Sequence, residues 1–271
     1  MIAPAAGARG GEPVAVLTIA GSDPSGAAGI AQDLATFHAL GVFGMVAVSA
    51  VTVQTPARVS WESVAPAVLA EQIAAAFGSM DVAAVKTGML PTAAHVRAVS
   101  AALAGSRAPL VLDPVLATSS GFPLADEDVP AALAEHLLPL ATLVTPNTEE
   151  AGRLAGIDVA SVAEMTEAAA RLRAAGAGAA LVTGGHLDGA TITDVLADEA
   201  GVRQYDAPRL GPGARGTGCV LSAAIAAALA TGEDLRAGVT RARAIVRQGL
   251  EQALRTRAGS GVTNPAGLRH F

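Results

Sequence analysis

The hydrophobic and polar positions alternate between two kinds of segment along the chain. Short runs of β-branched and aliphatic residues are typical of buried parallel strands, and the alanine-rich stretches between them have apolar residues at helical spacing. The predicted strands are Val14–Ile19, Met45–Val53, Ala83–Thr87, Leu110–Leu112, Leu143–Thr145 and Ala179–Thr183. The predicted helices are Ile30–Leu40, Ala67–Phe77, Ala93–Ala104, Ala163–Ala175 and Val220–Ala230.

This alternation predicts an α/β fold built from βαβ units, with one mostly parallel sheet covered by helices on both faces. No long polar linker interrupts the pattern, so we expect residues 14–271 to form a single domain. Residues 1–13 are rich in Ala and Gly and lack an apolar segment behind basic residues. We therefore expect a disordered lead-in there and not a signal peptide.

Composition narrows the class of partner to a small molecule. The formal net charge is −6, and the chain has no run of basic residues that would suit a nucleic acid or an anionic membrane. The apolar runs are broken well before the roughly 18 residues that span a bilayer. Cys219 is the single cysteine, which excludes an internal disulfide and favours a reducing compartment, by default the cytoplasm.

The first loop with unusual residues, GSDPSGAAG at 21–29, directly follows the first predicted strand. In sheets of this kind, ligands bind beyond the carboxyl ends of the strands. The glycines allow close approach of backbone to a ligand, and we expect Asp23 or Ser25 to cap the next helix. The loop matches neither a Walker loop nor the dinucleotide fingerprint, and an ordinary glycine-rich turn is the alternative.

The strongest signal is the turn GARGTGC at 213–219, directly before a predicted helix. A glycine-rich turn at a helix N-terminus offers free N–H groups and the positive end of the helix dipole, which together suit a phosphate. Cys219 falls in the first helical turn, where we expect the dipole to lower the thiol pKa and make it a proton acceptor. A buried structural cysteine is the alternative.

A third group of polar residues ends other predicted strands. Asn147 and Glu150 have the spacing to hold a hydrated Mg²⁺, which needs few protein oxygens, but an N-terminal helix cap explains them equally well. Asp113 lies on the same rim, where it can approach the metal or the phosphates, or act as a cap. Residues 183–186 (TGGH) can line a nucleotide site, although His186 alone is typical of a surface residue.

These segments occur together, in an order and spacing that resemble the hydroxymethylpyrimidine/phosphomethylpyrimidine kinases. The resemblance rests on the SDPSG loop, Gln54, Lys86–Leu90 (KTGML), Leu112–Val115 (LDPV), Thr145–Asn147 with Glu150, Gly184–His186 and Gly216–Cys219 (GTGC). It covers roughly residues 14 to 265. It implies the ribokinase-like fold, a three-layer αβα sandwich, and a homodimer.

The resemblance also implies an activity. The γ-phosphoryl group of ATP would pass to the hydroxymethyl group of 4-amino-5-hydroxymethyl-2-methylpyrimidine and then to the resulting monophosphate, in thiamine biosynthesis. Gln54 would bind the aminopyrimidine edge, since it offers both a donor and an acceptor. Gly21, Asp33, Met89 and Val115 would lie near the ring.

The roles implied for the remaining residues divide between chemistry and nucleotide binding. Cys219 would accept the hydroxyl proton, and the amides from Gly216 through Gly218 to Cys219 would stabilise the transferred phosphoryl group. Because phosphoryl transfer depends mainly on positioning and charge neutralisation, we expect this anion hole to matter more than the base. ATP would be bound by Asp113, Asn147, Thr183, Arg215 and Thr217, and Mg²⁺ by Glu150 and Asp113.

Three segments depart from the pattern of that family. Thr55 and Pro56 stand where Asn-Thr is usual after the glutamine, Ala214 and Arg215 where Thr-His is usual, and Thr183 where Lys is usual. Arg215 can supply phosphate-binding charge that Thr183 cannot, because a guanidinium pairs bidentately with phosphate oxygens. A surface arginine is the alternative interpretation.

Three other functions compete with this kinase. A pyridoxal kinase of the same superfamily would phosphorylate a similar ring, but Gln54 favours the aminopyrimidine. A catalytically silent pyrimidine sensor is disfavoured by the intact Asn147, Glu150, Asp113 and GTGC turn. A dinucleotide-dependent oxidoreductase would fit the sheet but lacks the fingerprint glycines.

Overall fold

The computed structural model describes residues 13–55, 58–211, 213–257 and 261–265, which form a nine-stranded sheet and a two-stranded sheet. The large sheet has the order β3-β2-β1-β4-β5-β6-β7-β8-β9, and β10 pairs with β11. The strands are β1 Ala15–Ser22, β2 Phe43–Thr55, β3 Arg58–Ser63, β4 Val82–Thr87, β5 Leu110–Leu112, β6 Leu143–Val144, β7 Ala180–Val182, β8 Thr191–Asp198, β9 Gly201–Pro208, β10 Leu254–Arg255 and β11 Gly261–Val262. Six neighbouring strands of the sheet, β2, β1, β4, β5, β6 and β7, are parallel to one another. Strands β3, β8 and β9 at the two edges are antiparallel to their neighbours, and the mostly parallel sheet is thus confirmed.

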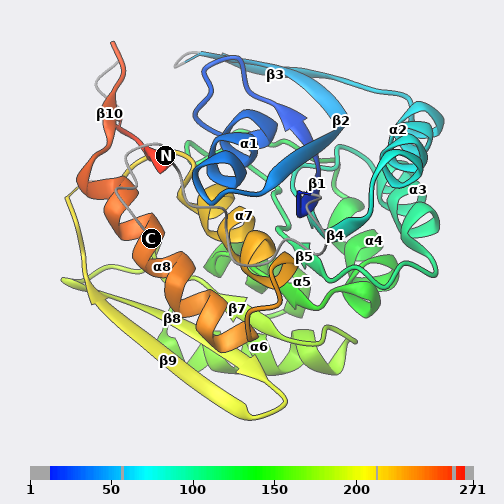
Figure 1. The fold of residues 1–271 in the computed structure, drawn as a ribbon. Helices are drawn as coiled ribbons and strands as arrows, with labels where there is room; N and C mark the ends of the chain where they lie inside the picture. Colours follow the sequence, from blue (N-terminus) through cyan, green and yellow to red (C-terminus); the bar gives the residue numbers. More distant parts are fainter. Residues whose placement is uncertain (1–12, 56–57, 212, 258–260, 266–271) are drawn as a thin grey trace.

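Helices cover both faces of this sheet (Figure 1). They are α1 Gly29–Ala39, α2 Pro66–Ser79, α3 Ala93–Leu103, α4 Val129–His136, the 3₁₀ turn η1 Leu138–Leu140, α5 Thr148–Ala155, α6 Val162–Ala174, α7 Thr217–Ala230 and α8 Leu235–Glu251. One hydrophobic cluster joins the sheet to α1, α7 and α8, and a second joins its other face to α2 through α6. The predicted three-layer αβα sandwich is confirmed.

Helix α7 is the most deeply buried helix on its face because its sequence is apolar on every side. Small residues such as Ala223 and Ala227 let it lie close to α1 and α8, while Val220 and Ile225 are fully buried. A helix that is hydrophobic all round is expected in an interior position. Burial begins at Val220, so the first turn of the helix, with Cys219, lies at the edge of this buried region.

Each predicted strand and helix coincides with an observed element, with ends that agree within three residues. The hydrophobic pattern missed the antiparallel strands β3, β8 and β9, the short strands β10 and β11, and helices α4, α5 and α8. The expectation that every strand is fully buried is wrong for the second half of β2. That half extends past β1 and pairs with β3, which leaves Val51 55% and Val53 54% exposed.

The strand order places the carboxyl ends of β1 and β4 beside each other. The chain moves from β1 to β2 on one side and then returns to β4 on the other. Ligands of open α/β sheets bind at such a switch point. The loops after these two strands, residues 23–28 and 88–92, are therefore where a site is expected.

Two further sequence predictions concern the N-terminal lead-in and membrane-spanning helices. The predicted lead-in falls almost entirely on residues 1–12, which lie outside the described ranges. Among the residues that the structure describes, no helix has the length and apolar character to cross a membrane.

Candidate active site

A cavity of about 50 Å³ lies at the carboxyl ends of β1, β2 and β4. It brings together five residues singled out in the sequence, namely Gly21, Gln54, Met89, Val115 and Cys219. The other lining residues are Ala20, Ser22, Asp23, Ala28, Gly29, Thr52, Lys86, Gly88 and Leu124. Small-molecule sites usually measure about 300–1,000 Å³. The cavity in this structure is smaller than that.

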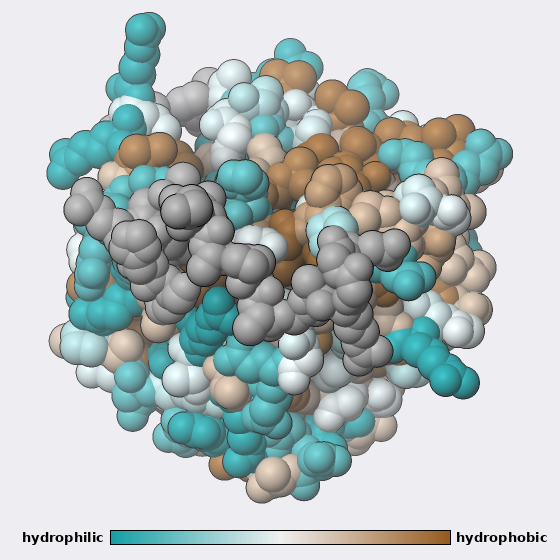
Figure 2. Space-filling view, in the orientation of Figure 1, coloured by the Kyte–Doolittle hydropathy of each residue, from teal (hydrophilic) through white to brown (hydrophobic). Residues whose placement is uncertain are grey.

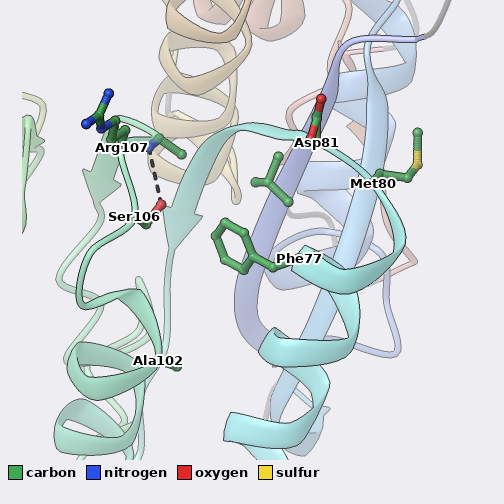
Figure 3. Close-up of a pocket in the computed structure, with 8 residues that line it drawn as sticks. Phe77, Met80, Asp81, Ala102, Ser106 and Arg107 are labelled. Carbon is green, nitrogen blue, oxygen red and sulfur yellow. Dashed lines mark hydrogen bonds between the residues drawn. The ribbon is translucent and has the colours of Figure 1, made fainter.

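A larger cavity, of about 440 Å³, lies at the opposite end of the sheet, where α2 ends and β4 begins (Figure 3). Figure 3 shows Phe77 directed into it from α2, and Ser106 accepting a hydrogen bond from the backbone of Ala108 at 3.2 Å. None of the predicted site residues lines it. Ligands of such sheets bind at the carboxyl ends of the strands, whereas this larger cavity lies at their amino ends. The smaller cavity is therefore the candidate active site.

The loop after β1 is held by its own side chains. The Asp23 carboxylate accepts hydrogen bonds from the Ser25 backbone N–H at 2.9 Å and from the Ser25 hydroxyl at 2.8 Å. The expectation that one of these residues caps the next helix is wrong, since α1 begins after Ala28 without a side-chain cap. Gly29 opens this helix with a φ of +60°, and a Cβ there would lie 2.2 Å from the Gly21 oxygen. The loop therefore folds back on the end of its own strand.

The GTGC turn packs against this first loop. Gly216 precedes α7 with a φ of +83°, and a Cβ on it would lie 2.2 Å from the Ala27 oxygen, so only glycine fits. The first backbone bond of the helix runs from Val220 N to Gly216 O at 2.9 Å. The N–H groups of Thr217, Gly218 and Cys219 lie ahead of that bond, where a helix leaves its amides without intrahelical acceptors. This geometry suits an anion.

The Cys219 thiol lines the cavity, but its pKa differs from the expectation. Burial raises the thiol pKa from 9.0 to about 12, and the Lys86 charge and a hydrogen bond from the Gly29 backbone only partly oppose this effect. The predicted lowering by the helix dipole is therefore wrong for this state, because desolvation outweighs the favourable groups. At neutral pH the thiol is protonated.

Lys86, the single lysine of the chain, lies in the floor of the cavity with no exposed surface. Its ammonium donates to both oxygens of Asp33, at 3.0 and 2.9 Å, and lies 3.8 Å from Asp113. Burial alone would lower the Lys86 pKa, but the charge of Asp33 raises it above its ordinary value. The resemblance assigned this residue no role, although a lone lysine in an arginine-rich chain was a signal.

Asp33 lies behind the cavity and does not line it. The carboxylate is fully buried and accepts hydrogen bonds from Lys86 and from the Thr18 hydroxyl at 2.6 Å. This position differs from the expectation that Asp33 lies near the ring, because the long lysine side chain occupies the space between them. Asp33 can act on a ligand only through Lys86.

The predicted metal residues lie together at the ends of β5 and β6. Asn147 and Glu150 form a capping box, in which each side chain accepts from the other residue's backbone N–H at 2.9 Å. Burial and then the charge of Asp113 raise the Glu150 pKa to about 8, and burial also raises the Asp113 pKa. The Ser222 hydroxyl donates to Asp113 at 2.8 Å.

Two buried carboxylates whose charges repel each other favour a nearby cation. In the described part of the chain, no three His, Cys, Asp or Glu side chains are grouped as in a metal site built by protein alone. Mg²⁺ commonly uses one or two carboxylates together with waters and substrate phosphates. Asp113 and Glu150 therefore fit Mg²⁺ as a partner of bound ATP, while Asn147 supplies the cap.

The predicted nucleotide loop after β7 lies next to Asn147, which pairs with Thr183 in an isolated β-bridge. An unpredicted residue, Arg209, holds this loop. Its guanidinium donates to the carbonyls of Gly185 and Gly189, both at 2.9 Å, and to that of Leu187. No local pattern distinguishes Arg209 from the other arginines, so its role could not be predicted from the sequence.

Arg215 lies on the cavity side of the GTGC turn. Its Nη2 donates to Asp23 Oδ2 at 3.0 Å and to Gln54 Oε1 at 2.6 Å, and its Nη1 lies 3.4 Å from the Ser25 hydroxyl. The charge is thus already paired with Asp23. The prediction that Arg215 compensates for Thr183 by binding phosphate stays a prediction, and in this arrangement it would require Arg215 to leave these partners.

Comparisons with known proteins match nearly the whole chain. The sequence model of the phosphomethylpyrimidine kinase family matches residues 23–264. A hydroxymethylpyrimidine/phosphomethylpyrimidine kinase of Rhizobium meliloti is 42% identical, with 90% of this chain and 93% of that protein covered. The thiamine biosynthesis bifunctional protein ThiED of Geobacter sulfurreducens is 40% identical over 92% of this chain, which spans about half (51%) of that relative.

Solved structures of related kinases superpose on most of this chain. The pyridoxal kinase of Staphylococcus aureus in complex with pyridoxal superposes with a TM-score of 0.88 at 30% identity, covering 95% of each chain. The phosphomethylpyrimidine kinase of Clostridium difficile 630 gives a TM-score of 0.76 at 33% identity, covering 86% of this chain and 97% of that one. From the match over residues 23–264 and the 42% identity to the Rhizobium enzyme, the chain belongs to the phosphomethylpyrimidine kinase family, a family of phosphotransferases.

Proposed function

We propose that this kinase transfers the γ-phosphoryl group of ATP to 4-amino-5-hydroxymethyl-2-methylpyrimidine and then to its monophosphate, in thiamine biosynthesis. The observation that carries this proposal is the cavity itself. Gln54, Met89 and Val115 line the same small space as Cys219, the first-turn residue of α7. A ring held by Gln54, Met89 and Val115 would present its hydroxymethyl group to the N–H groups at the start of α7.

The cavity has an apolar side and a polar side, as an aminopyrimidine requires. Met89 and Leu124 form a buried cluster against which Val115 and Trp61 pack, and this cluster can cover the faces of a ring. Gln54 supplies the hydrogen-bonding edge. Trp61 comes from β3, a strand that the hydrophobic pattern missed, so its contribution was not foreseen.

For the transfer itself, the substrate hydroxyl oxygen would attack the γ-phosphorus while the bond to the departing ADP breaks. The amides of Thr217, Gly218 and Cys219 would hold the charge of the moving phosphoryl group, as the start of a helix suits. The hydroxyl proton would pass to the Cys219 sulfur, and for this the thiol, which is protonated in the ligand-free protein, must first be in its thiolate form. Lys86 favours that form, since its charge lowers the thiol pKa. Mg²⁺, held by Asp113 and Glu150, would supply further neutralisation of phosphate charge.

We extend the proposal to the assembly and compartment. The exposed Val51 and Val53 on β2, with Val68 on α2, supply an apolar surface suited to a second copy of the chain, and Figure 2 shows hydrophobic residues gathered over this part of the protein. Sedimentation equilibrium should therefore give twice the 26.7 kDa chain mass, and a single-chain mass would refute the dimer. The single cysteine suits the cytoplasm.

One assay separates the candidate functions. ATP consumption should be measured with Mg²⁺ and, side by side, the pyrimidine, its monophosphate and pyridoxal. We expect turnover with both pyrimidines and a much lower kcat/KM with pyridoxal. A preference for pyridoxal would favour the second candidate, which the similarity to the Staphylococcus aureus enzyme supports. Turnover with none of the three would favour the silent sensor.

A further inference from the structure

We propose that Arg215 determines substrate specificity by fixing the orientation of the Gln54 side-chain amide. With Gln54 fixed, the site would accept a ring nitrogen acceptor beside an amino donor and reject the inverted pattern. The inference rests on the proposed function, because it concerns the edge of the ring that Gln54 binds. The two residues are 161 positions apart in the sequence; Gln54 lines the cavity, and Arg215 contacts it from outside the lining.

The contacts of Gln54 permit one orientation of its amide. Arg215 Nη2 lies 2.6 Å from Gln54 Oε1, and a guanidinium has only donors, so the atom that faces it must be the oxygen. At the other end, Gln54 Nε2 lies 3.0 Å from Thr52 Oγ1. The Thr52 hydroxyl donates its proton to the Ser22 carbonyl at 2.6 Å, so its oxygen must accept from Gln54. Both contacts select this orientation, but a hydroxyl is also a donor and can turn to serve a reversed amide, whereas a guanidinium cannot, so Arg215 is the stricter constraint.

Arg215 is itself held in place by Asp23. Its Nη2 also donates to the Asp23 carboxylate at 3.0 Å, and that carboxylate is buried. Asp23 in turn accepts from the backbone and the hydroxyl of Ser25. A charged donor bound to a fixed carboxylate gives Gln54 a partner that does not turn away.

The fixed amide has a consequence for the ligand. Gln54 retains one N–H and one oxygen lone pair, since an amide has two of each and one of each is used. An aminopyrimidine edge matches this remaining pair, because its ring nitrogen accepts and its amino group donates. In the 4-oxo analogue the ring nitrogen carries a proton and the neighbouring carbonyl accepts, so the order is inverted. A free amide would rotate to serve either edge, whereas a fixed amide leaves the inverted edge unpaired.

The Arg215 side chain can be changed without releasing the GTGC turn. The backbone N–H of Arg215 donates to the Gly261 carbonyl at 3.0 Å, and its carbonyl accepts from the N–H and hydroxyl of Thr263 at 3.0 and 2.9 Å. These are main-chain contacts of Arg215, so they persist when the side chain is replaced. A substitution there tests the guanidinium and leaves the loop anchored.

The test is the ratio of kcat/KM for 4-amino-5-hydroxymethyl-2-methylpyrimidine to that for its 4-oxo analogue, at saturating ATP. In Arg215→Met this ratio should fall about tenfold to one-hundredfold, the range expected for losing a hydrogen bond to a charged group. Arg215→Gln, the second variant, should lower it similarly. Arg215→Lys keeps a charged donor and should retain most of the wild-type ratio.

Arg171→Met is the matched control, because Arg171 is an exposed arginine of α6 paired with Glu167, and its ratio should equal that of wild type. An unchanged ratio in Arg215→Met and Arg215→Gln would overturn the inference. A raised KM for ATP with an unchanged ratio would assign Arg215 to phosphate binding and also overturn it. Failure of the wild-type protein to phosphorylate the aminopyrimidine would instead overturn the proposed function, and this inference with it.

Discussion

Replacing Lys86 with methionine should destabilise the protein more than replacing Asp33 with asparagine, although each change removes one partner of the same buried ion pair. Lys86→Met leaves the Asp33 carboxylate buried with only the Thr18 hydroxyl as a side-chain partner. Asp33→Asn leaves the Lys86 ammonium 3.8 Å from Asp113, which still compensates its charge. Breaking a buried pair so that one charge is left unpaired costs about 3–5 kcal/mol. We expect that loss for Lys86→Met and a smaller one for Asp33→Asn.

Urea unfolding followed by circular dichroism measures both losses, and thermal unfolding checks them. At about 2–4 °C per kcal/mol for a chain of this size, Lys86→Met should lower the Tm by about 6–20 °C. The double variant Lys86→Met with Asp33→Asn leaves no unpaired charge between these two positions, so it should lose less than the sum of the single changes. The reasoning is refuted if Lys86→Met costs under 1 kcal/mol, or if Asp33→Asn costs more than Lys86→Met.

Two further predictions concern groups whose pKa is raised by burial. Because the folded-state pKa of Glu150 is about 8 against an ordinary 4.5, the folded protein holds this proton more tightly. The resulting stabilisation is complete below pH 4.5 and is lost as the pH rises to 8. Urea unfolding in EDTA should therefore show a smaller drop in unfolding free energy between these pH values for Glu150→Gln than for wild type. Cys219→Ala and Cys219→Ser should each lower kcat by 10² or more if the sulfur accepts the hydroxyl proton.

Each of these two predictions has a matched control. Gln at position 150 keeps an oxygen that can accept from the Asn147 backbone, so the capping box is retained. An equal difference in unfolding free energy between wild type and Glu150→Gln at pH 5 and pH 8 would contradict the raised pKa. For Cys219, a kcat within about fivefold of wild type would exclude proton transfer to the sulfur. An unchanged KM for ATP in the same variants would show that the phosphate-binding turn is intact.

The sequence by itself determined the order of the central strands and helices along the chain and the position of the glycine-rich turn before α7. Periodicity and glycine placement are local properties, so they located α7 and the residues before it within three positions. The resemblance then selected Gly21, Gln54, Met89, Val115 and Cys219, which the structure brings to one cavity.

Only the tertiary structure decided how those residues behave. The antiparallel β3 packs Trp61 against Met89 and Leu124, which line the cavity, and this short strand with mixed polarity has no periodic signal. The pKa of Cys219 is set by burial among segments distant in sequence, which outweighs the local helix dipole. The contacts of Arg215 with Gln54 and of Lys86 with Asp33 likewise join residues far apart along the chain. Desolvation and long-range pairing depend on which elements pack together, and the order of residues in one segment does not contain that information.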